Sequence, residues 1–140
     1  MRKATDNDKE FLWSLVVASM GSYIEQVYGW DVSVVYARFE ENYRTETMKI
    51  IQCDGQDVGM VELLDNPQEI FLTRIAILPE YQNRGIGSTI LQNAIAEAAT
   101  AHKPLRLQVF KINPARGLYE RLGFVKTAET MRHIQMELSL

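Results

Sequence analysis

The sequence is poor in cysteine and histidine: its 140 residues include one cysteine, Cys53, and two histidines, His102 and His133. A single cysteine cannot form an intrachain disulfide, which excludes a disulfide-framed secreted domain. These three residues lack the spacing of metal ligands, so the sequence predicts no zinc site or other metal site. The fold must therefore depend on its hydrophobic core.

The sequence also lacks long apolar runs and an excess of positive charge. The run Phe11–Met20 is interrupted by Trp13 and two serines, so it is too short to span a bilayer. Residues Arg2–Glu10 are polar and show no targeting pattern, so we expect a cytoplasmic protein without a membrane partner. The 15 Lys and Arg residues face 18 Asp and Glu residues, and the net charge of −3 argues against nucleic acid as a partner.

What is present is the composition of a globular domain. Hydrophobic residues make up 46% of the chain and charged residues 24%, a balance that is typical of folded domains with a sizeable core. A length of 140 residues is one domain's worth of sequence, so we expect a single domain over residues 1–140.

The first third of the chain has helical periodicity. Thr5 and Asp8 have the spacing of a capping box. Apolar residues then recur at steps of three and four, which predicts a helix over Phe11–Val27. Gly29-Trp30-Asp31 interrupts this pattern, and a second helix is predicted around Val34–Phe39.

The rest of the chain alternates between strand and helix patterns. Turn signals at Asp54-Gly55 and Asp65-Asn66-Pro67 separate the first three strands, which indicates an antiparallel meander. The order of helices, meander, helix, strand, helix and two strands predicts an α+β fold. We predict strands at Met48–Cys53, Val58–Leu64, Glu69–Leu78, Leu105–Phe110, Phe124–Thr127 and His133–Leu138, and helices at Ile86–Ala99 and Pro114–Leu122.

A glycine-rich turn, Gln82-Asn83-Arg84-Gly85-Ile86-Gly87, opens the helix Ile86–Ala99. Glycines let the backbone turn tightly and approach a ligand closely. The first N–H groups of a helix lack intrahelical partners and lie at the positive end of its dipole. With Arg84 they would form a seat for a phosphate or pyrophosphate, and a purely structural turn is the alternative. The turn is not a Walker loop, because no Gly-Lys-Ser/Thr follows, and it lacks the third glycine of a dinucleotide fingerprint.

Two segments resemble motifs of the GNAT superfamily of N-acetyltransferases. The stretch Ile75–Gly87 is similar to the acyl-CoA-binding motif Gln/Arg-x-x-Gly-x-Gly/Ala, which follows a strand. Downstream, Asn113–Phe124 resembles a segment of the same superfamily with the pattern Asn-x-x-Ala/Arg-x-x-x-Tyr-x-x-x-Gly-Phe. Two motifs in the right order are more specific than either alone. The resemblance runs from about Met48 to Leu140, and the leading strand of the family would fit into the short segment Arg2–Thr5.

The resemblance implies a mixed, mainly antiparallel central sheet flanked by helices. It also implies transfer of an acetyl group from acetyl-CoA to a primary amine by direct attack in a ternary complex. No acyl-enzyme is needed, which agrees with the position of Cys53 in a predicted strand without a paired base. The acceptor, a small-molecule or peptide amine, cannot be identified from the sequence.

The resemblance also implies which residues hold the acetyl-CoA. The main chain of the strand residues Ile75, Ala76 and Ile77 would pair with the pantetheine arm, and Asn113 would hydrogen-bond the same arm. The pyrophosphate would be bound by the turn, chiefly through the amides from about Arg84 onward; the turn comprises Gln82, Asn83, Arg84, Gly85, Ile86, Gly87 and Ser88.

Proton transfer requires an acid and a base. Tyr119 would stand near the thioester sulfur, and a tyrosine with a reference pKa of about 10 carries the proton that a general acid must donate. The alternative is that its ring only packs near Leu122 and Phe124. Glu62, in the strand Val58–Leu64, resembles the base position of some family members; an ordinary exposed residue is the alternative. Glu25 and Glu69 are weaker candidates.

Other features allow two interpretations. A non-catalytic acyl-CoA-binding or sensing module would keep the turn but would need neither Tyr119 nor a base. Small GNAT proteins are often dimers, and the apolar last strand, His133–Leu138, would leave a vulnerable edge if unpaired, so a homodimer is predicted. Aromatic residues in the N-terminal region would either line an acceptor pocket or belong to the core: Tyr23, Tyr28, Trp30 and Tyr36.

Overall fold

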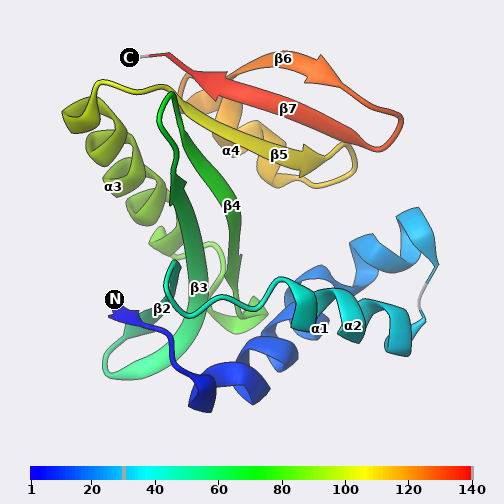
Figure 1. The fold of residues 1–140 in the computed structure, drawn as a ribbon. Coiled ribbons are helices and arrows are strands. Elements are labelled where there is room, and N and C mark those ends of the chain that lie inside the picture. Colours follow the sequence, from blue (N-terminus) through cyan, green and yellow to red (C-terminus); the bar gives the residue numbers. More distant parts are fainter. Residues whose placement is uncertain (30, 140) are drawn as a thin grey trace. The chain divides into compact units, whose positions relative to one another are not determined.

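The computed structural model describes residues 1–29 and 31–139, with the side chains of residues 20, 22–24 and 26–28 outside the description. Every predicted helix and strand is confirmed, and the ends differ from the predictions by at most two residues. The elements, labelled in Figure 1, are β1 (Arg2–Lys3), η1 (Asp6–Asp8), α1 (Lys9–Tyr28), α2 (Val32–Glu41), β2 (Met48–Cys53), β3 (Gln56–Asp65), β4 (Ile70–Ile77), η2 (Pro79–Tyr81), α3 (Ile86–Ala101), β5 (Leu105–Phe110), α4 (Ala115–Arg121), β6 (Val125–Glu129) and β7 (His133–Leu138).

Within the described residues, seven strands form one sheet in the order β1-β2-β3-β4-β5-β7-β6. The pairs β1·β2, β2·β3, β5·β7 and β6·β7 are antiparallel, whereas β4 and β5 are parallel over Ile70–Leu72 and Leu105–Leu107. The predicted α+β fold with a mixed, mainly antiparallel sheet is confirmed. No helix in the described ranges is long and apolar enough to cross a membrane.

The last strand, His133–Leu138, is paired on both sides, so the condition for a vulnerable edge is not met. β7 lies between β5 and β6 and pairs with both of them, as Figure 1 shows. The turn between β6 and β7 places β6 on the outer side of β7. β6 is therefore the terminal strand of the sheet, and all of its residues are exposed. Lys126, Glu129 and a register shift between Lys126 and Ala128 make β6 a poor template for further pairing. The homodimer remains a prediction, but an unpaired edge at β7 no longer supports it.

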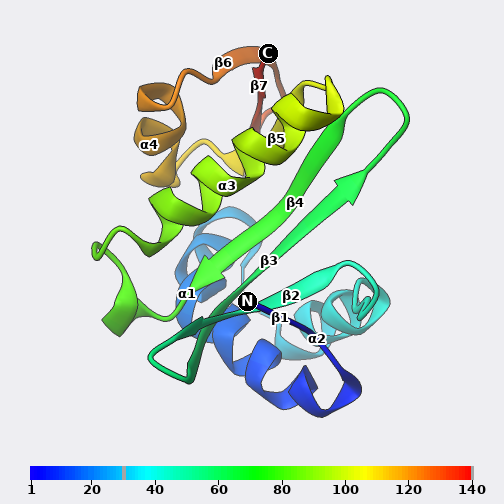
Figure 2. The ribbon, with the colours of Figure 1, turned by 90° about the vertical axis from the view of Figure 1, so that its left-hand side faces the viewer.

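The chain divides into two compact units, Met1–Glu62 with Arg74–Gln82, and Leu63–Thr73 with Asn83–Leu140. The core of the first unit joins α1 and α2 to β2 and β3. It consists of Ala4, Leu12, Leu15, Phe39, Met48, Ile50 and Met60. Figure 2 shows α1 and α2 side by side, and the ring of Trp13 on α1 meets the ring of Tyr36 on α2 edge-on at 4.9 Å.

Of the four aromatic residues with two interpretations, Tyr36 is partly buried and packs against the core of the first unit. Its ring contacts Phe39 as well as Trp13. The side chains of Tyr23 and Tyr28, and the whole of Trp30, lie outside the described residues.

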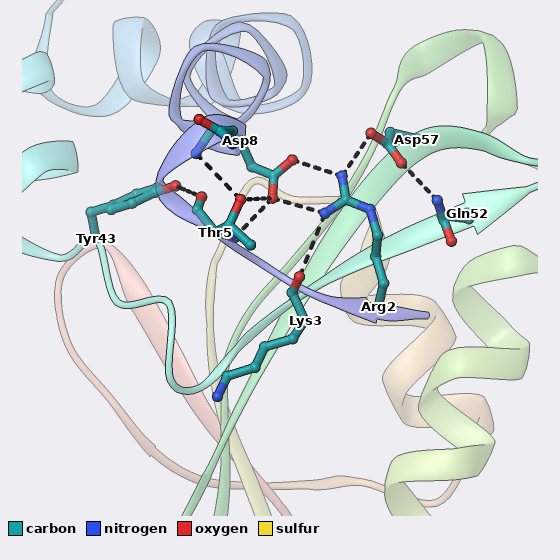
Figure 3. A network of polar contacts seen from close by, with 8 residues as sticks. Arg2, Lys3, Thr5, Asp8, Tyr43, Gln52 and Asp57 are labelled. Carbon is teal, nitrogen blue, oxygen red and sulfur yellow. Dashed lines mark hydrogen bonds and ion pairs between the residues drawn. The ribbon is translucent and has the colours of Figure 1, made fainter.

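A polar network fastens the N-terminal segment of the first unit (Figure 3). The Arg2 guanidinium donates to both carboxylate oxygens of Asp8, at 2.9 and 2.7 Å, and to Asp57 Oδ2 at 2.9 Å. Asp8 also accepts from the Thr5 main-chain N–H at 2.8 Å, which confirms the predicted capping box. The Tyr43 hydroxyl donates to the Thr5 carbonyl at 2.6 Å. The two-residue strand β1 is therefore held by side chains as well as by its ladder with β2.

Asp8→Asn is expected to lower the free energy of unfolding at pH 7 by about 1–2 kcal/mol. The hydrogen bonds from Arg2 hold the pKa of Asp8 at about 2, below its ordinary 3.8. A carboxyl group with a lowered pKa stabilises the fold above its unfolded pKa, and this contribution disappears as the pH falls through the folded pKa. Urea unfolding at pH 7 and at pH 2 measures the effect, and exposed Asp6→Asn is the control. Equal losses in both variants at pH 7 would contradict the prediction.

The second unit contains α3, α4 and the strands β5, β6 and β7, together with the ends of β3 and β4. α3 contacts β5 and buries Ile90, Leu91, Ala94 and Ala98, which form one helical face. The other buried residues of this unit are Ile70, Leu72, Leu105, Leu107, Val109, Tyr119, Phe124, Ile134 and Met136.

Candidate active site

The glycine-rich turn lies between η2 and α3, as predicted. Gly85 is the N-cap of α3 with φ +82°, a left-handed conformation in which a side chain is strained. Among the described residues, no side chain caps this helix and no acidic residue lies in its first turn. The N–H groups of Ile86, Gly87 and Ser88 therefore remain available at the positive end of the helix dipole. This arrangement suits an anion such as a phosphate.

Gln82 supports the shape of this turn. Its side-chain Nε2 donates to the carbonyl of Ile77 at 2.9 Å, and its main-chain N–H donates to Pro79 at 3.2 Å. The side chain is therefore used within the protein. A binding role of its main chain remains a prediction.

The residues Ile75, Ala76 and Ile77 form the end of β4 and are partly buried. Gly59 of β3 lies against them, because a Cβ at Gly59 would collide with the carbonyl oxygen of Ala76 and would lie 3.2 Å from Ile77 Cα. Sequence reasoning missed Gly59, and its only signal was a glycine inside a strand pattern. The close contact with Gly59 constrains the position of the β4 backbone at Ala76 and Ile77, which was predicted to pair with pantetheine.

Asn113 and Tyr119 lie at the start and near the end of α4. Asn113 Oδ1 accepts from the main-chain N–H of Ala115 at 2.9 Å, so the predicted cofactor ligand also holds the start of the helix. Its amide NH₂ group remains as a donor. Tyr119 is 6% exposed, and its ring meets Phe124 at 5.8 Å between centroids.

The hydroxyl of Tyr119 has the properties of a proton donor. No described residue hydrogen-bonds to it. Burial raises the pKa of Tyr119 to about 12, so the hydroxyl keeps its proton throughout the neutral range. The packing interpretation accounts for the ring, but it gives no role to the hydroxyl.

Glu62 is fully buried, which excludes the interpretation of an ordinary exposed residue. Arg44 Nε and Nη2 donate to its two oxygens at 3.0 and 2.8 Å, a bidentate pair. The Thr47 hydroxyl donates to Oε2, and Arg74 Nε lies 3.6 Å from Oε1. Every carboxylate oxygen is therefore engaged.

These partners determine the charge of Glu62. Burial by itself would raise its pKa, but the hydrogen bonds from Arg44 and Thr47 and the charge of Arg74 outweigh burial and leave the pKa below its ordinary value. Glu62 is therefore ionised and weakly basic at neutral pH. Of the weaker base candidates, Glu25 is exposed on α1, and Glu69 lies 3.5 Å from Arg106.

Sequence reasoning missed the partners of Glu62. Arg44 and Thr47 lie between α2 and β2, in a segment without periodicity. Arg74 had one signal, a cation within the apolar strand pattern of β4. Within the described ranges, no group of three or more His, Cys, Asp or Glu residues could hold a metal ion.

The comparisons with known proteins concern the family and the fold. Residues 44–126 match the profile of the acetyltransferase (GNAT) domain. The search of curated proteins found no significant match. The solved PaiA N-acetyltransferase of Thermoplasma acidophilum, in complex with coenzyme A, superposes with a TM-score of 0.80 at 20% identity, over 99% of this chain and 97% of that one. The ribosomal-protein-S18-alanine N-acetyltransferase of Escherichia coli gives 0.73 at 22% identity, over 99% and 92%. At these identities the likeness shows the fold.

Proposed function

The chain belongs to the GNAT acetyltransferase family, and on this premise we propose that it transfers an acetyl group from acetyl-CoA to a primary amine. The observation that carries the proposal is the start of α3 after Gly85, which no side chain caps in the described part of the chain. A pyrophosphate accepts hydrogen bonds from several adjacent N–H groups at once, and Arg84 in the same turn adds positive charge. The main chain of Ile75–Ile77 and the amide of Asn113 are the proposed partners of the pantetheine arm.

The proposed reaction is direct attack of the amine on the thioester. The amine nitrogen forms a bond to the acetyl carbon and the carbon–sulfur bond breaks. The amine releases one proton to water, which later restores the proton donor, and the departing thiolate gains one proton. Tyr119 is the proposed donor of that proton, because its hydroxyl remains protonated and unpartnered among the described residues. No covalent enzyme intermediate is required.

A screen tests this function. Thiol release from acetyl-CoA is measured over a panel of primary amines, and CoA binding is measured separately by calorimetry. Amine-dependent thiol release is the expected result. CoA binding without turnover for any amine would instead indicate an acyl-CoA-binding or sensing module, and absence of CoA binding would overturn the proposed site.

Glu62→Gln tests whether Glu62 is a general base or a structural residue that holds Arg44 and Arg74 in place. Removing the charge leaves Arg44 and Arg74 close together without compensation, so we expect the free energy of unfolding to fall by about 2–4 kcal/mol. This value lies at the lower part of the range for buried pairs because both arginines are partly exposed. Urea unfolding measures the effect, and the exposed neighbour Glu46→Gln is the control.

The pH dependence of the same variant tests the predicted base. If Glu62 removes the proton of the amine, the defect in kcat/KM shrinks at high pH, where more amine is already deprotonated. If Glu62 anchors the two arginines, the defect is independent of pH. We expect the second result, because the pKa of Glu62 lies below its ordinary value.

A further inference from the structure

Three charged groups of the first unit meet at one place: Glu62, Arg44 and Arg74. Two guanidinium groups against one carboxylate leave a net charge of +1. Arg44 binds both carboxylate oxygens of Glu62 in the bidentate geometry that satisfies a carboxylate best. The surplus positive charge therefore belongs to Arg74.

Arg74 is incompletely paired. Its Nε lies 3.6 Å from Glu62 Oε1, which is an ion pair but too long for a hydrogen bond. Its Nη2 donates to the carbonyl of Asn42 at 3.4 Å, a long contact. Within the described part of the chain, Arg74 has no other polar partner. A guanidinium has five N–H donors, so most of those on Arg74 have no acceptor among the described residues.

Partial burial makes the surplus positive charge of Arg74 energetically unfavourable, while the exposed part of its side chain remains accessible to a ligand. The side chain of Arg74 is 27% exposed and that of Arg44 is 37% exposed, while Glu62 is completely covered. A partly desolvated cation that has few and distant acceptors among the described residues is stabilised by an anion that enters from solvent. The charge of the exposed residue Glu46 raises the pKa of Arg44. Glu46 is not among the groups that shift the pKa of Arg74, so it does not balance the charge of Arg74.

The position of Arg74 on β4 relates it to the reaction. The turn proposed for the pyrophosphate follows Ile77 in the chain, so the pantetheine arm in the proposed complex would run from Ile77 through Ala76 to Ile75. The acetyl end then lies on the N-terminal side of Ile75, where Arg74 is the next residue. An anion bound to Arg74 would be close to the acetyl group.

We propose that the acceptor is a primary amine that also carries a carboxylate, and that Arg74 binds this carboxylate. The inference rests on the proposed function and adds the chemical class of the acceptor. The planar fork of a guanidinium matches a carboxylate in two parallel hydrogen bonds. The single surplus charge balances a monoanion, which favours a carboxylate over a phosphate dianion. Arg74 is thus a specificity-determining residue.

Matched pairs of amines test the proposal. Glycine, β-alanine and lysine are each compared with the corresponding carboxamide, which keeps the amine and removes the negative charge. The unmodified protein is expected to favour the carboxylate in kcat/KM by about 10- to 100-fold, the range of a hydrogen bond to a charged group. In Arg74→Gln this preference falls to near one, because KM rises for the carboxylates and rises less for the carboxamides.

A control variant and a second substitution complete the experiment. Arg106→Gln, in the second unit, removes an arginine that pairs with Glu137 at 2.7 Å, and the carboxylate preference should persist. Arg74→Lys keeps the charge and loses the fork, so an intermediate preference is expected. It serves as the test variant if Arg74→Gln fails to fold, since unfolding is monitored in parallel.

Each outcome separates the two proposals. If amines are acetylated without preference for a carboxylate, this inference fails and the proposed function stands. If no amine is acetylated, the proposed function fails, and calorimetry of the same carboxylates with the CoA-bound protein decides whether Arg74 binds them. O-phosphoethanolamine reacting better than β-alanine would replace the carboxylate by a phosphate and overturn the stated class.

Discussion

Gly87→Val is expected to abolish CoA binding, with an affinity loss of more than about 100-fold, while the protein stays folded. Gly87 is the second residue of α3, in the turn whose N–H groups have no cap among the described residues. A β-branched side chain there would hold the pyrophosphate away from those donors. Each hydrogen bond to a charged group contributes about 1.5–3 kcal/mol, so the loss of two already exceeds this factor.

The same substitution should not weaken the helix. Valine has a better helix propensity than glycine, so loss of binding cannot be attributed to fraying of α3. Ala96→Val places the same side chain at an exposed position of the same helix and should leave binding unchanged. Calorimetry and thermal unfolding are measured on both variants. Unchanged CoA affinity in folded Gly87→Val would contradict the proposed phosphate-binding site at this turn. Strong binding of pantetheine without phosphate would also count against that site.

Tyr119→Phe is expected to lower kcat and kcat/KM together by about 10²–10⁴-fold, the range of general acid–base assistance. The ring contact with Phe124 is kept, and the hydroxyl has no hydrogen bond to any described residue that the substitution could break. Stability and CoA affinity should therefore change little. Because the pKa of Tyr119 is about 12, its proton is present at every neutral pH, and the defect should be constant between about pH 6 and pH 9.

Tyr43→Phe is the matched control for this prediction. It removes a hydroxyl that donates to the Thr5 carbonyl, so it should lower stability and leave the rate of acetyl transfer unchanged. The two variants thus separate loss of a structural hydroxyl from loss of a chemical one. If Tyr119→Phe turns over at the parent rate, with the chemical step rate-limiting, Tyr119 is a packing residue. Direct attack on a bound thioester would remain possible in that case.

Local features of the fold could be predicted from the sequence because their causes are local. The capping box of Thr5 and Asp8 depends on residues three positions apart, and it forms as predicted. α3 follows from apolar residues at helical spacing, and the left-handed N-cap requires a glycine such as Gly85. The turn and the segment Asn113–Phe124 are short motifs, so family and fold were accessible before any tertiary contact was known.

Features that depend on distant residues could not be predicted in this way. Periodicity identifies β7 as a strand, but its place between β5 and β6 depends on which ladders close. The environment of Glu62 combines Arg44 and Thr47 from a loop without periodicity and Arg74 from another strand. A pKa depends on burial and on charges within a few ångströms, and both are set by chain segments far apart in sequence. The sequence by itself therefore determined the helices and strands and the two motifs that resemble the GNAT family. Only the tertiary structure brought the buried carboxylate of Glu62 together with two arginines, one of which is incompletely paired among the described residues.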